Sequence, residues 1–310
     1  MAAVTASMVK DLREMTGAGM MDCKKALTQT DGDMDKAVEF LRENGLAKAA
    51  KKAGRIAAEG LVKVVNDGDR KAAIVEVNSE TDFVAKNADF ASYVEQVANQ
   101  ALTTDAKDID AFMKEAWKAE PGKTVEEALA GKVAVIGENL KIRRFEKIEV
   151  DNEHIVVSYI HGGGRIGTIV VAKAPDTDDA KEVIKNVAMQ VAALAPKYTN
   201  RDEVDQEYIE NEKKVLLAEA KNEKPDANEK MLDGIVNGRI NKQLKEICLL
   251  DQVYIKAEDG KQQVSAYLKE ESKRLGAEIM VERFVRFETG EGLEKKNEDF
   301  AAEVAAQMNQ

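Results

Sequence analysis

The sequence predicts an α+β fold in which paired antiparallel strands and amphipathic helices occupy separate stretches of the chain. Two short runs rich in β-branched residues, joined by a glycine-containing turn and followed by a helix-period pattern, occur twice. Helical patterns alone fill the N-terminal stretch and a later insertion. With 310 residues, 44% of them hydrophobic, the chain can bury a core and corresponds to about two domains.

Residues 1–54 are predicted to form a compact module of three helices. Thr5 and Asp33 are suitable N-caps for the first and third helices. Gly45 is expected to end the third helix, ahead of a basic helical connector over residues 48–52. The apolar positions at helical spacing are Met8, Leu12, Met15, Met34, Val38 and Leu41.

Residues 55–147 are predicted to hold a first α+β subdomain. Residues 61–65 and 72–77 are expected to be strands, and Asn-Asp-Gly at residues 66–68 is typical of a hairpin turn. A polar loop and an amphipathic helix follow, and then two more helices, the second opened by a capping-box sequence at Thr124. The apolar face of the amphipathic helix that directly follows the polar loop consists of Phe90, Val94, Val97, Ala98 and Ala101.

Residues 148–289 are predicted to repeat this unit. Strands are expected over residues 155–160 and 165–173, joined by three glycines at 162–164 and followed by a helix. Short apolar pairs recur in the two units at offsets of 95 and 94 residues. This recurrence indicates two related subdomains, and chance similarity of short apolar runs is the alternative. A further helix and a further strand are expected near residues 264–275 and 278–287.

Residues 201–248 interrupt the second subdomain with two long helical patterns. Pro225 lies between them, where neither helix can easily continue. An inserted antiparallel helical hairpin is the simplest interpretation. Residues 290–310 are expected to form a C-terminal helical module after a Gly-Glu-Gly break, with an apolar stripe of Phe300, Val304 and Met308.

Composition excludes several classes of function. The chain has only two histidines and two cysteines, and the cysteines are far apart, so a zinc site, a disulfide framework and a Cys/His nucleophile all lack support. The net charge is −11, divided into +2 over residues 1–55 and −13 over the remainder, which argues against a general nucleic-acid binder. No signal peptide or membrane-length apolar run is present, so we expect a cytoplasmic protein that does not bind membranes.

The run Gly-Gly-Gly-Arg-Ile-Gly at residues 162–167 formally fits a dinucleotide-binding pattern. Such a site needs a helix directly after the glycines, whereas a strand is predicted here. We therefore expect a hairpin turn, and no cofactor, metal ion or directly bound nucleotide. His154 and His161 flank one predicted strand at an odd spacing, which places them on opposite faces and disfavours a shared metal site.

Two short motifs are candidate binding sites. The polar loop after the second strand allows two interpretations. In the structural one, Thr81 or Asp82 caps a helix and Phe83 packs beneath it. In the functional one, Phe83 is an apolar wedge that enters a partner. In the N-terminal module, the adjacent Met20 and Met21 cannot both face one side of a helix. Either one packs in the core and the other is incidental, or an exposed methionine serves as a contact.

Five separated motifs resemble the bacterial elongation factor Ts family, and their order and spacing match over essentially the whole chain. The first and third motifs are the most specific, whereas residues 104–123 and the helical insertion match only in kind. The motifs are Thr16–Leu27, Lys48–Gly54, Thr81–Asn87, His161–Gly167, and Val285–Glu288 with Gly290–Lys295.

The resemblance implies a guanine-nucleotide exchange factor that binds elongation factor Tu in its GDP-bound and nucleotide-free forms. Such a protein disturbs the Mg²⁺ and phosphate site of its partner, so that GDP leaves and GTP can bind. It is not an enzyme that acts on a covalent bond. The resemblance also implies that residues 1–54 form a ubiquitin-associated-like domain.

The resemblance also assigns roles to individual residues. The residues implied to act at the partner's magnesium site are Thr81, Asp82, Phe83 and Val84. Other contacts with the partner are implied for Met20, Met21, His161 and the C-terminal helix. The alternative is a helical protein-interaction adaptor without exchange activity, which residues 1–45 alone would allow.

Overall fold

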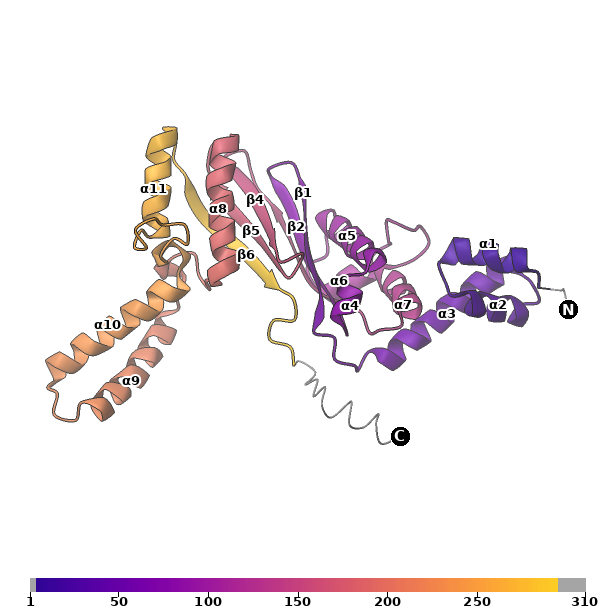
Figure 1. Ribbon diagram of the computed structural model, residues 1–310, viewed down its shortest axis with the longest axis horizontal. Coiled ribbons are helices and arrows are strands. Elements are labelled where there is room, and N and C mark those ends of the chain that lie inside the picture. Colours follow the sequence, from indigo (N-terminus) through magenta and orange to yellow (C-terminus); the bar gives the residue numbers. More distant parts are fainter. Residues whose placement is uncertain (1–3, 295–310) are drawn as a thin grey trace.

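The computed structural model describes residues 4–294, and these confirm the predicted α+β fold. The molecule is an elongated arch with a helical module at one end, two sheets with their helices in the middle, and a long helical hairpin at the other end (Figure 1). The predicted C-terminal stripe of Phe300, Val304 and Met308 lies outside the described residues.

The N-terminal module forms around its own small core. Thr5 caps the first helix and Asp33 caps the third, as predicted, and each side chain accepts a backbone N–H. Met15 is exposed, so the predicted stripe was wrong at that position, and Val9 and Leu12 fill the inner face. The helices are α1 (Ala6–Thr16), α2 (Met20–Gln29) and α3 (Met34–Lys52).

The expectation that Gly45 ends the third helix was wrong, because α3 runs on without a break to Lys52. Gly45 is buried against the backbone of Ala130 in α7 (Val125–Ile136). The cost of a glycine inside a helix is about 1 kcal/mol, and packing against a neighbouring helix can offset it. An ion pair between Arg42 and Glu127 also joins α3 to α7.

The first sheet is antiparallel, with its three strands side by side in chain order and helices packed against it. The predicted hairpin is present, but its turn lies at residues 68–70, because Asn66 and Asp67 still pair with the opposite strand. The third strand was not predicted, because consecutive arginines and a register shift interrupt its alternation. Residues 104–123 complete the core, where Trp117 packs on Tyr93 with ring centroids 5.9 Å apart. The elements are β1 (Glu59–Asp67), β2 (Lys71–Ser79), β3 (Lys141–Glu149), α5 (Ala88–Leu102), α6 (Ile109–Lys114) and α7.

The second sheet has the same order and antiparallel pairing as the first. In each sheet a long helix, α5 or α8, follows the middle strand after a short connection. The predicted glycine turn joins the first two strands, and a strand rather than a helix follows it, as expected. The elements are β4 (His154–His161), β5 (Ile166–Lys173), α8 (Asp178–Leu194), α11 (Val264–Leu275) and β6 (Met280–Glu288).

The two sheets pack face to face through a shared apolar layer that includes Val62 and Ile74 from one sheet and Ile169 from the other. Gly167 permits this close approach, since a Cβ atom there would lie only 2.5 Å from Val62 Cγ1. The Val62 N–H also donates a 2.7 Å hydrogen bond to the carbonyl of Gly164. The glycine-rich motif is therefore a structural element of the core as well as a turn.

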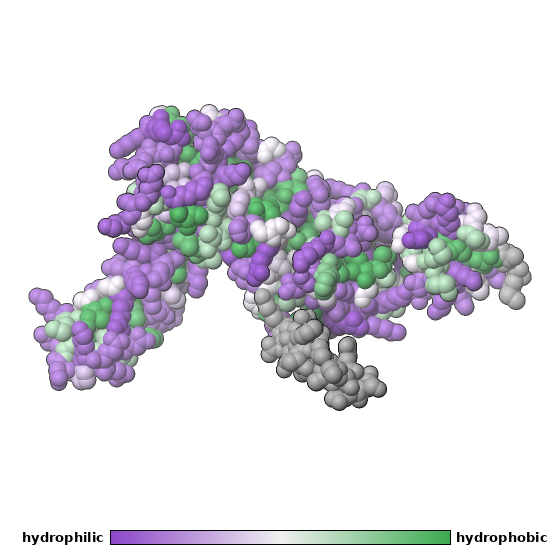
Figure 2. Space-filling model, viewed as in Figure 1, coloured by the Kyte–Doolittle hydropathy of each residue, from purple (hydrophilic) through white to green (hydrophobic). Residues whose placement is uncertain are grey.

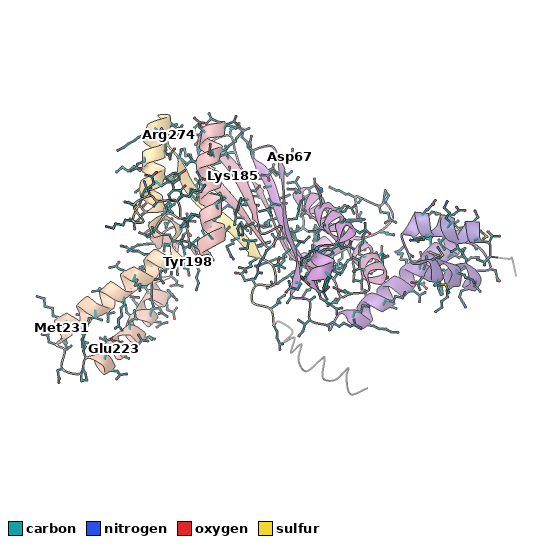
Figure 3. The ribbon with its side chains drawn as sticks, in the orientation of Figure 1. Asp67, Lys185, Tyr198, Glu223, Met231 and Arg274 are labelled. Carbon is teal, nitrogen blue, oxygen red and sulfur yellow. The ribbon has the colours of Figure 1, made fainter. Side chains whose placement is uncertain are left out.

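The inserted hairpin consists of α9 (Gln206–Glu223) and α10 (Glu229–Ile247), with Pro225 in the connecting turn as predicted. Figure 3 shows Tyr198 near its base and Glu223 and Met231 near its far end. The two helices bury an apolar seam between them, formed chiefly by Leu216, Ala220, Val236, Ile240 and Leu244.

A buried carboxylate joins the first sheet to the chain that follows the second. Glu76 of β2 is fully buried and accepts hydrogen bonds from Arg144 Nε at 2.6 Å, Arg143 Nη1 at 3.0 Å and Gly290 N at 2.8 Å. Burial by itself would raise the pKa of Glu76. The hydrogen bonds from Gly290 and Asn78 and the two arginines outweigh it and hold the pKa below its usual value.

Replacing Glu76 by glutamine is expected to lower the free energy of unfolding by about 3 kcal/mol, because two arginines lose a buried anion. The contribution of a carboxylate with a depressed pKa is present above the unfolded-state pKa and is lost as the pH falls through the folded-state pKa. The difference between E76Q and the parent protein in urea unfolding should therefore shrink in acid. E149Q, at an exposed position of β3, is the control, and an equal effect of both variants would contradict the assignment.

His154 supplies a second, opposite pH dependence. Its Nδ1 lies 2.5 Å from Asp151 and its Nε2 lies 2.9 Å from Glu282 of β6, and these hydrogen bonds raise its pKa above the ordinary 6.5. The resulting stabilisation is present below pH 6.5 and is lost as the pH rises through the folded-state pKa.

The difference in free energy of unfolding between the parent protein and H154Q is expected to be larger at about pH 5.5 than at about pH 9. Urea unfolding at the two pH values measures it. A difference that stays constant, or that grows with pH, would contradict the raised pKa.

Candidate functional site

The loop after β2 projects an apolar side chain into solvent. It contains the single-turn helix α4 (Asp82–Ala85), and the Thr81 side chain caps this helix by accepting the Val84 N–H at 3.4 Å. Capping by Thr81 was one part of the structural interpretation, and that part is confirmed. The packing of Phe83 beneath the helix was the other part, and it is wrong, because Phe83 is 82% exposed. Val84 instead packs against the core and anchors the turn.

Asp82 lies beside Phe83 and carries its charge at the surface. Its carboxylate accepts a 2.6 Å hydrogen bond from Lys86, one helical turn further on, and this bond lowers the pKa of Asp82. An exposed pair at this spacing holds its partners only weakly, so another charged group can replace Lys86 at little cost. The loop thus presents an apolar ring and an exchangeable carboxylate side by side.

Glu138, in the segment between α7 and β3, holds this loop and was not predicted. One carboxylate oxygen accepts the backbone N–H groups of Glu80 and Thr81 at 3.0 and 3.1 Å, and the other accepts the Thr81 hydroxyl at 2.6 Å. The residues are 57 or more positions apart in sequence, so no local pattern could have indicated this contact.

His161 lies exposed at the β4–β5 turn, as expected, and its Nδ1 is 3.0 Å from the Tyr159 hydroxyl. The turn lies at the same end of the core as the loop between β2 and α5, residues 80–87, which is called the Thr81 loop. Glu59 of β1 pairs with Ser79, which leads into the loop, and the nearby Val62 bonds to Gly164 of the turn. Two motifs that are about 80 residues apart in the chain therefore emerge at one end of the paired sheets.

Met20 and Met21 are both exposed, by 57% and 74%, on the first turn of α2. The interpretation that one of them packs in the core was therefore wrong, because Cys23, Ala26 and Leu27 fill the inner face of α2. Figure 1 shows α2 in the terminal module, separated from α4 by α3 and α7. In Figure 2, hydrophobic surface is visible on this module and over the core, within a largely hydrophilic exterior.

Comparison with known proteins decides the family. A family model described as "Elongation factor TS" matches residues 80–291. The chain is 51% identical to Elongation factor Ts of Clostridium novyi (strain NT), with 99% of each chain covered. It is 52% identical to Elongation factor Ts of Clostridioides difficile (strain 630), with 99% of this chain and 100% of that protein covered. The chain belongs to the elongation factor Ts family.

This membership confirms the resemblance found in the motifs. The family is one of translation elongation factors. The matched region begins inside the Thr81 loop segment and ends at Glu291, one of the residues joined to Glu76 through the arginines. The relatives align over nearly their full length, so the N-terminal module is a shared feature as well.

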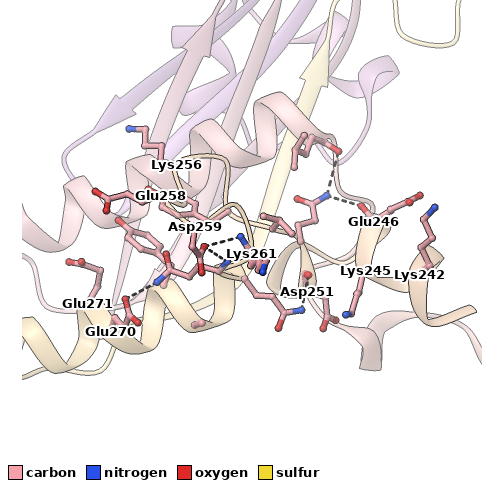
Figure 4. A pocket seen from close by; sticks show the side chains of 18 residues that line it. Lys242, Lys245, Glu246, Asp251, Lys256, Glu258, Asp259, Lys261, Glu270 and Glu271 are labelled. Carbon is pink, nitrogen blue, oxygen red and sulfur yellow. Dashed lines mark hydrogen bonds between the residues drawn. The ribbon is translucent and has the colours of Figure 1, made fainter. Parts of the chain in front are cut away.

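A large open pocket of this elongation factor Ts chain is lined by charges of both signs (Figure 4). It lies between the end of α10 and α11, and its lining includes Lys245, Lys261, Asp259 and Glu270 but no histidine or cysteine. Asp259 accepts backbone N–H groups of its own loop at 2.8 and 2.9 Å. These hydrogen bonds hold the loop together.

Residues 4–294 contain no group of three or more His, Cys, Asp or Glu side chains arranged to hold a metal ion. Over the same residues, no helix combines the length and apolarity that crossing a membrane would need. Both cysteines are buried and unpaired. Within this part of the chain, Phe83 is the most exposed large apolar side chain.

Because Phe83 makes so little contact with the rest of the chain, F83A is expected to change the free energy of unfolding by less than about 0.5 kcal/mol. F90A, which removes a fully buried ring of α5, is expected to cost about 3–5 kcal/mol. Urea unfolding of both variants checks the contrast. A large loss of stability in F83A would mean that its ring is part of the core.

Proposed function

We propose that the chain is the guanine-nucleotide exchange factor of elongation factor Tu and that it accelerates release of GDP so that GTP can bind. The observation that carries the proposal is the 82% exposed Phe83 beside Asp82 on a loop that the fold holds in place. The name Elongation factor Ts, borne by relatives about half identical over their full length, supports it. The proposed site of action is the cytoplasm, and no nucleotide, nucleic acid or membrane is bound directly.

The proposed mechanism is differential binding to two forms of the partner. No covalent bond is made or broken, so we propose that the chain is not an enzyme. A GTPase holds GDP through phosphate contacts and a Mg²⁺ ion that requires near-octahedral geometry. A factor that binds the nucleotide-free form more tightly lowers nucleotide affinity by the same factor, because the two equilibria are linked. The factor therefore needs surface groups that fit only the form whose magnesium site is disturbed.

Phe83 and Asp82 supply such groups. The exposed ring can insert between helices of the partner, where it gains burial that it lacks in the free chain. The Asp82 carboxylate then lies near the polar network around Mg²⁺ and phosphate, where a negative charge disfavours return of the anion. Thr81 and Val84 place the pair by capping and anchoring the single-turn helix.

Further contacts are proposed at a distance from this loop. Met20 and Met21 are exposed on α2, and their flexible side chains suit an apolar partner surface. His161 is exposed at the end of the core that carries the Thr81 loop and is proposed to contact a different domain of elongation factor Tu. Contacts at separate points would let the factor move one domain of its partner against another.

An adaptor without exchange activity is the second candidate, because exposed methionines on a small helical module also suit a general protein binder. The two candidates differ in what the core must do. An adaptor needs only the N-terminal module, whereas an exchange factor needs Phe83 and Asp82.

F83A and D82A are each expected to reduce the maximal acceleration of GDP release about tenfold or more while the protein stays folded, because each removes a group that favours the nucleotide-free partner. Release of a fluorescent GDP analogue from elongation factor Tu measures this. Y208A, which removes a partly exposed ring from the distant helix α9, is the control. Binding to elongation factor Tu with no acceleration by the parent protein would favour the adaptor.

A further inference from the structure

The side chain of Glu138 makes three hydrogen bonds, and all of them go to the loop that carries Phe83. They reach the N–H groups of Glu80 and Thr81 and the Thr81 hydroxyl. Hydrogen bonds to a charged acceptor are stronger than neutral ones, and two backbone N–H groups on one oxygen fix the direction of the loop. None of these contacts includes Phe83 or Asp82 themselves.

The neighbouring residues return the contact from the other side. The N–H of Asn139 donates to the Glu80 carboxylate at 2.5 Å, so each segment supplies a carboxylate that accepts a backbone N–H of the other. The Asn139 side chain donates to the carbonyl of Arg55 at 2.8 Å. The segment of Glu138 and Asn139 thus joins the Thr81 loop to the connection between α3 and β1.

The segment is itself held in place. Gly137 ends α7 in the left-handed conformation, with φ +87°, and its carbonyl accepts the Lys52 ammonium from the end of α3. Directly after Asn139, the buried Leu140 and Ile142 anchor the chain in the core of the first subdomain. A displacement of Glu138 therefore requires a change at the end of α7 or in the sheet.

We propose that Glu138 is a positioning residue that sets the rate of nucleotide exchange through the Thr81 loop. This inference rests on the proposed function. Glu138 holds Thr81, Thr81 caps the single-turn helix, and that helix presents Phe83 and Asp82 to the partner. A free loop would have to be ordered during the exchange step, and that cost in conformational entropy would appear in the rate.

Two variants separate the positioning role from mere structure. E138A removes all three acceptors, whereas the amide oxygen of E138Q still accepts backbone N–H groups and its amino group can donate to the Thr81 hydroxyl. The matched control is E126A, which removes one negative charge from an exposed position on the first turn of α7. Release of a fluorescent GDP analogue from elongation factor Tu is followed over a range of factor concentrations.

The expected result is a loss of about tenfold in the maximal rate with E138A, a change of less than about threefold in the half-saturating concentration, and substantial recovery with E138Q. Adding E138A to F83A should cost much less than it does alone, because both act through one loop. Wild-type rates with E138A, an unrecovered loss with E138Q, or full additivity with F83A would overturn the positioning role.

The same experiment distinguishes failure of the inference from failure of the proposed function. If F83A slows release and E138A does not, the loop acts in exchange and Glu138 does not position it, so the inference falls alone. If neither variant slows release while the parent protein accelerates it, the loop is not the exchange element, so the inference and the proposed role of Phe83 fall while exchange activity stands. If the parent protein itself gives no acceleration, the proposed function falls. A loss with E126A equal to that with E138A would assign the effect to charge and would also overturn the inference.

Discussion

The buried carboxylate of Glu76 is the interaction on which the arrangement of the core depends. It lies in the middle strand of the first sheet and binds two arginines of the adjacent strand and the N–H of Gly290, which follows the last strand of the second sheet. An unpaired charge at this depth would cost several kcal/mol, so its partners must stay in place together. The end of β2, the strand β3 and the chain after β6 are thereby held at one end of the paired sheets.

The loop that we propose to act on elongation factor Tu directly follows β2, the strand that carries Glu76. Three residues separate Glu76 from Glu80, and Glu138 lies five residues before Arg143 of β3, in the segment that leads into this strand. The side chains that we propose to contact the partner therefore extend from rigid elements, and Phe83 is left largely exposed in the free chain. Such a loop can give up contacts with solvent and gain contacts with the partner while losing little conformational freedom.

The sequence predicted those parts of the fold whose signals are local. Strand pairs with glycine turns, capped helices and the proline of the inserted hairpin each depend on residues close together in the chain, and the structure has them. Strand β3 was missed because Arg143 and Arg144 break its alternation of apolar and polar residues. These arginines bind Glu76, which lies 67 and 68 residues before them in the chain. Gly45 was misinterpreted because packing against the neighbouring helix α7 offsets the free-energy cost of a glycine inside a helix. The Phe83 motif was visible in the sequence, but its exposure and the role of Glu138 depend on contacts between distant segments.

On this account, the fold itself holds the Thr81 loop in its projecting conformation before any partner binds. Residue-resolved amide hydrogen exchange on the free protein can detect such order. The N–H groups of Glu80 and Thr81, which donate to Glu138, are expected to exchange at least about tenfold more slowly than an unstructured chain, although they lie in an exposed loop. Exchange of both groups at the unstructured rate in the free protein would show that the loop is ordered only by its partner.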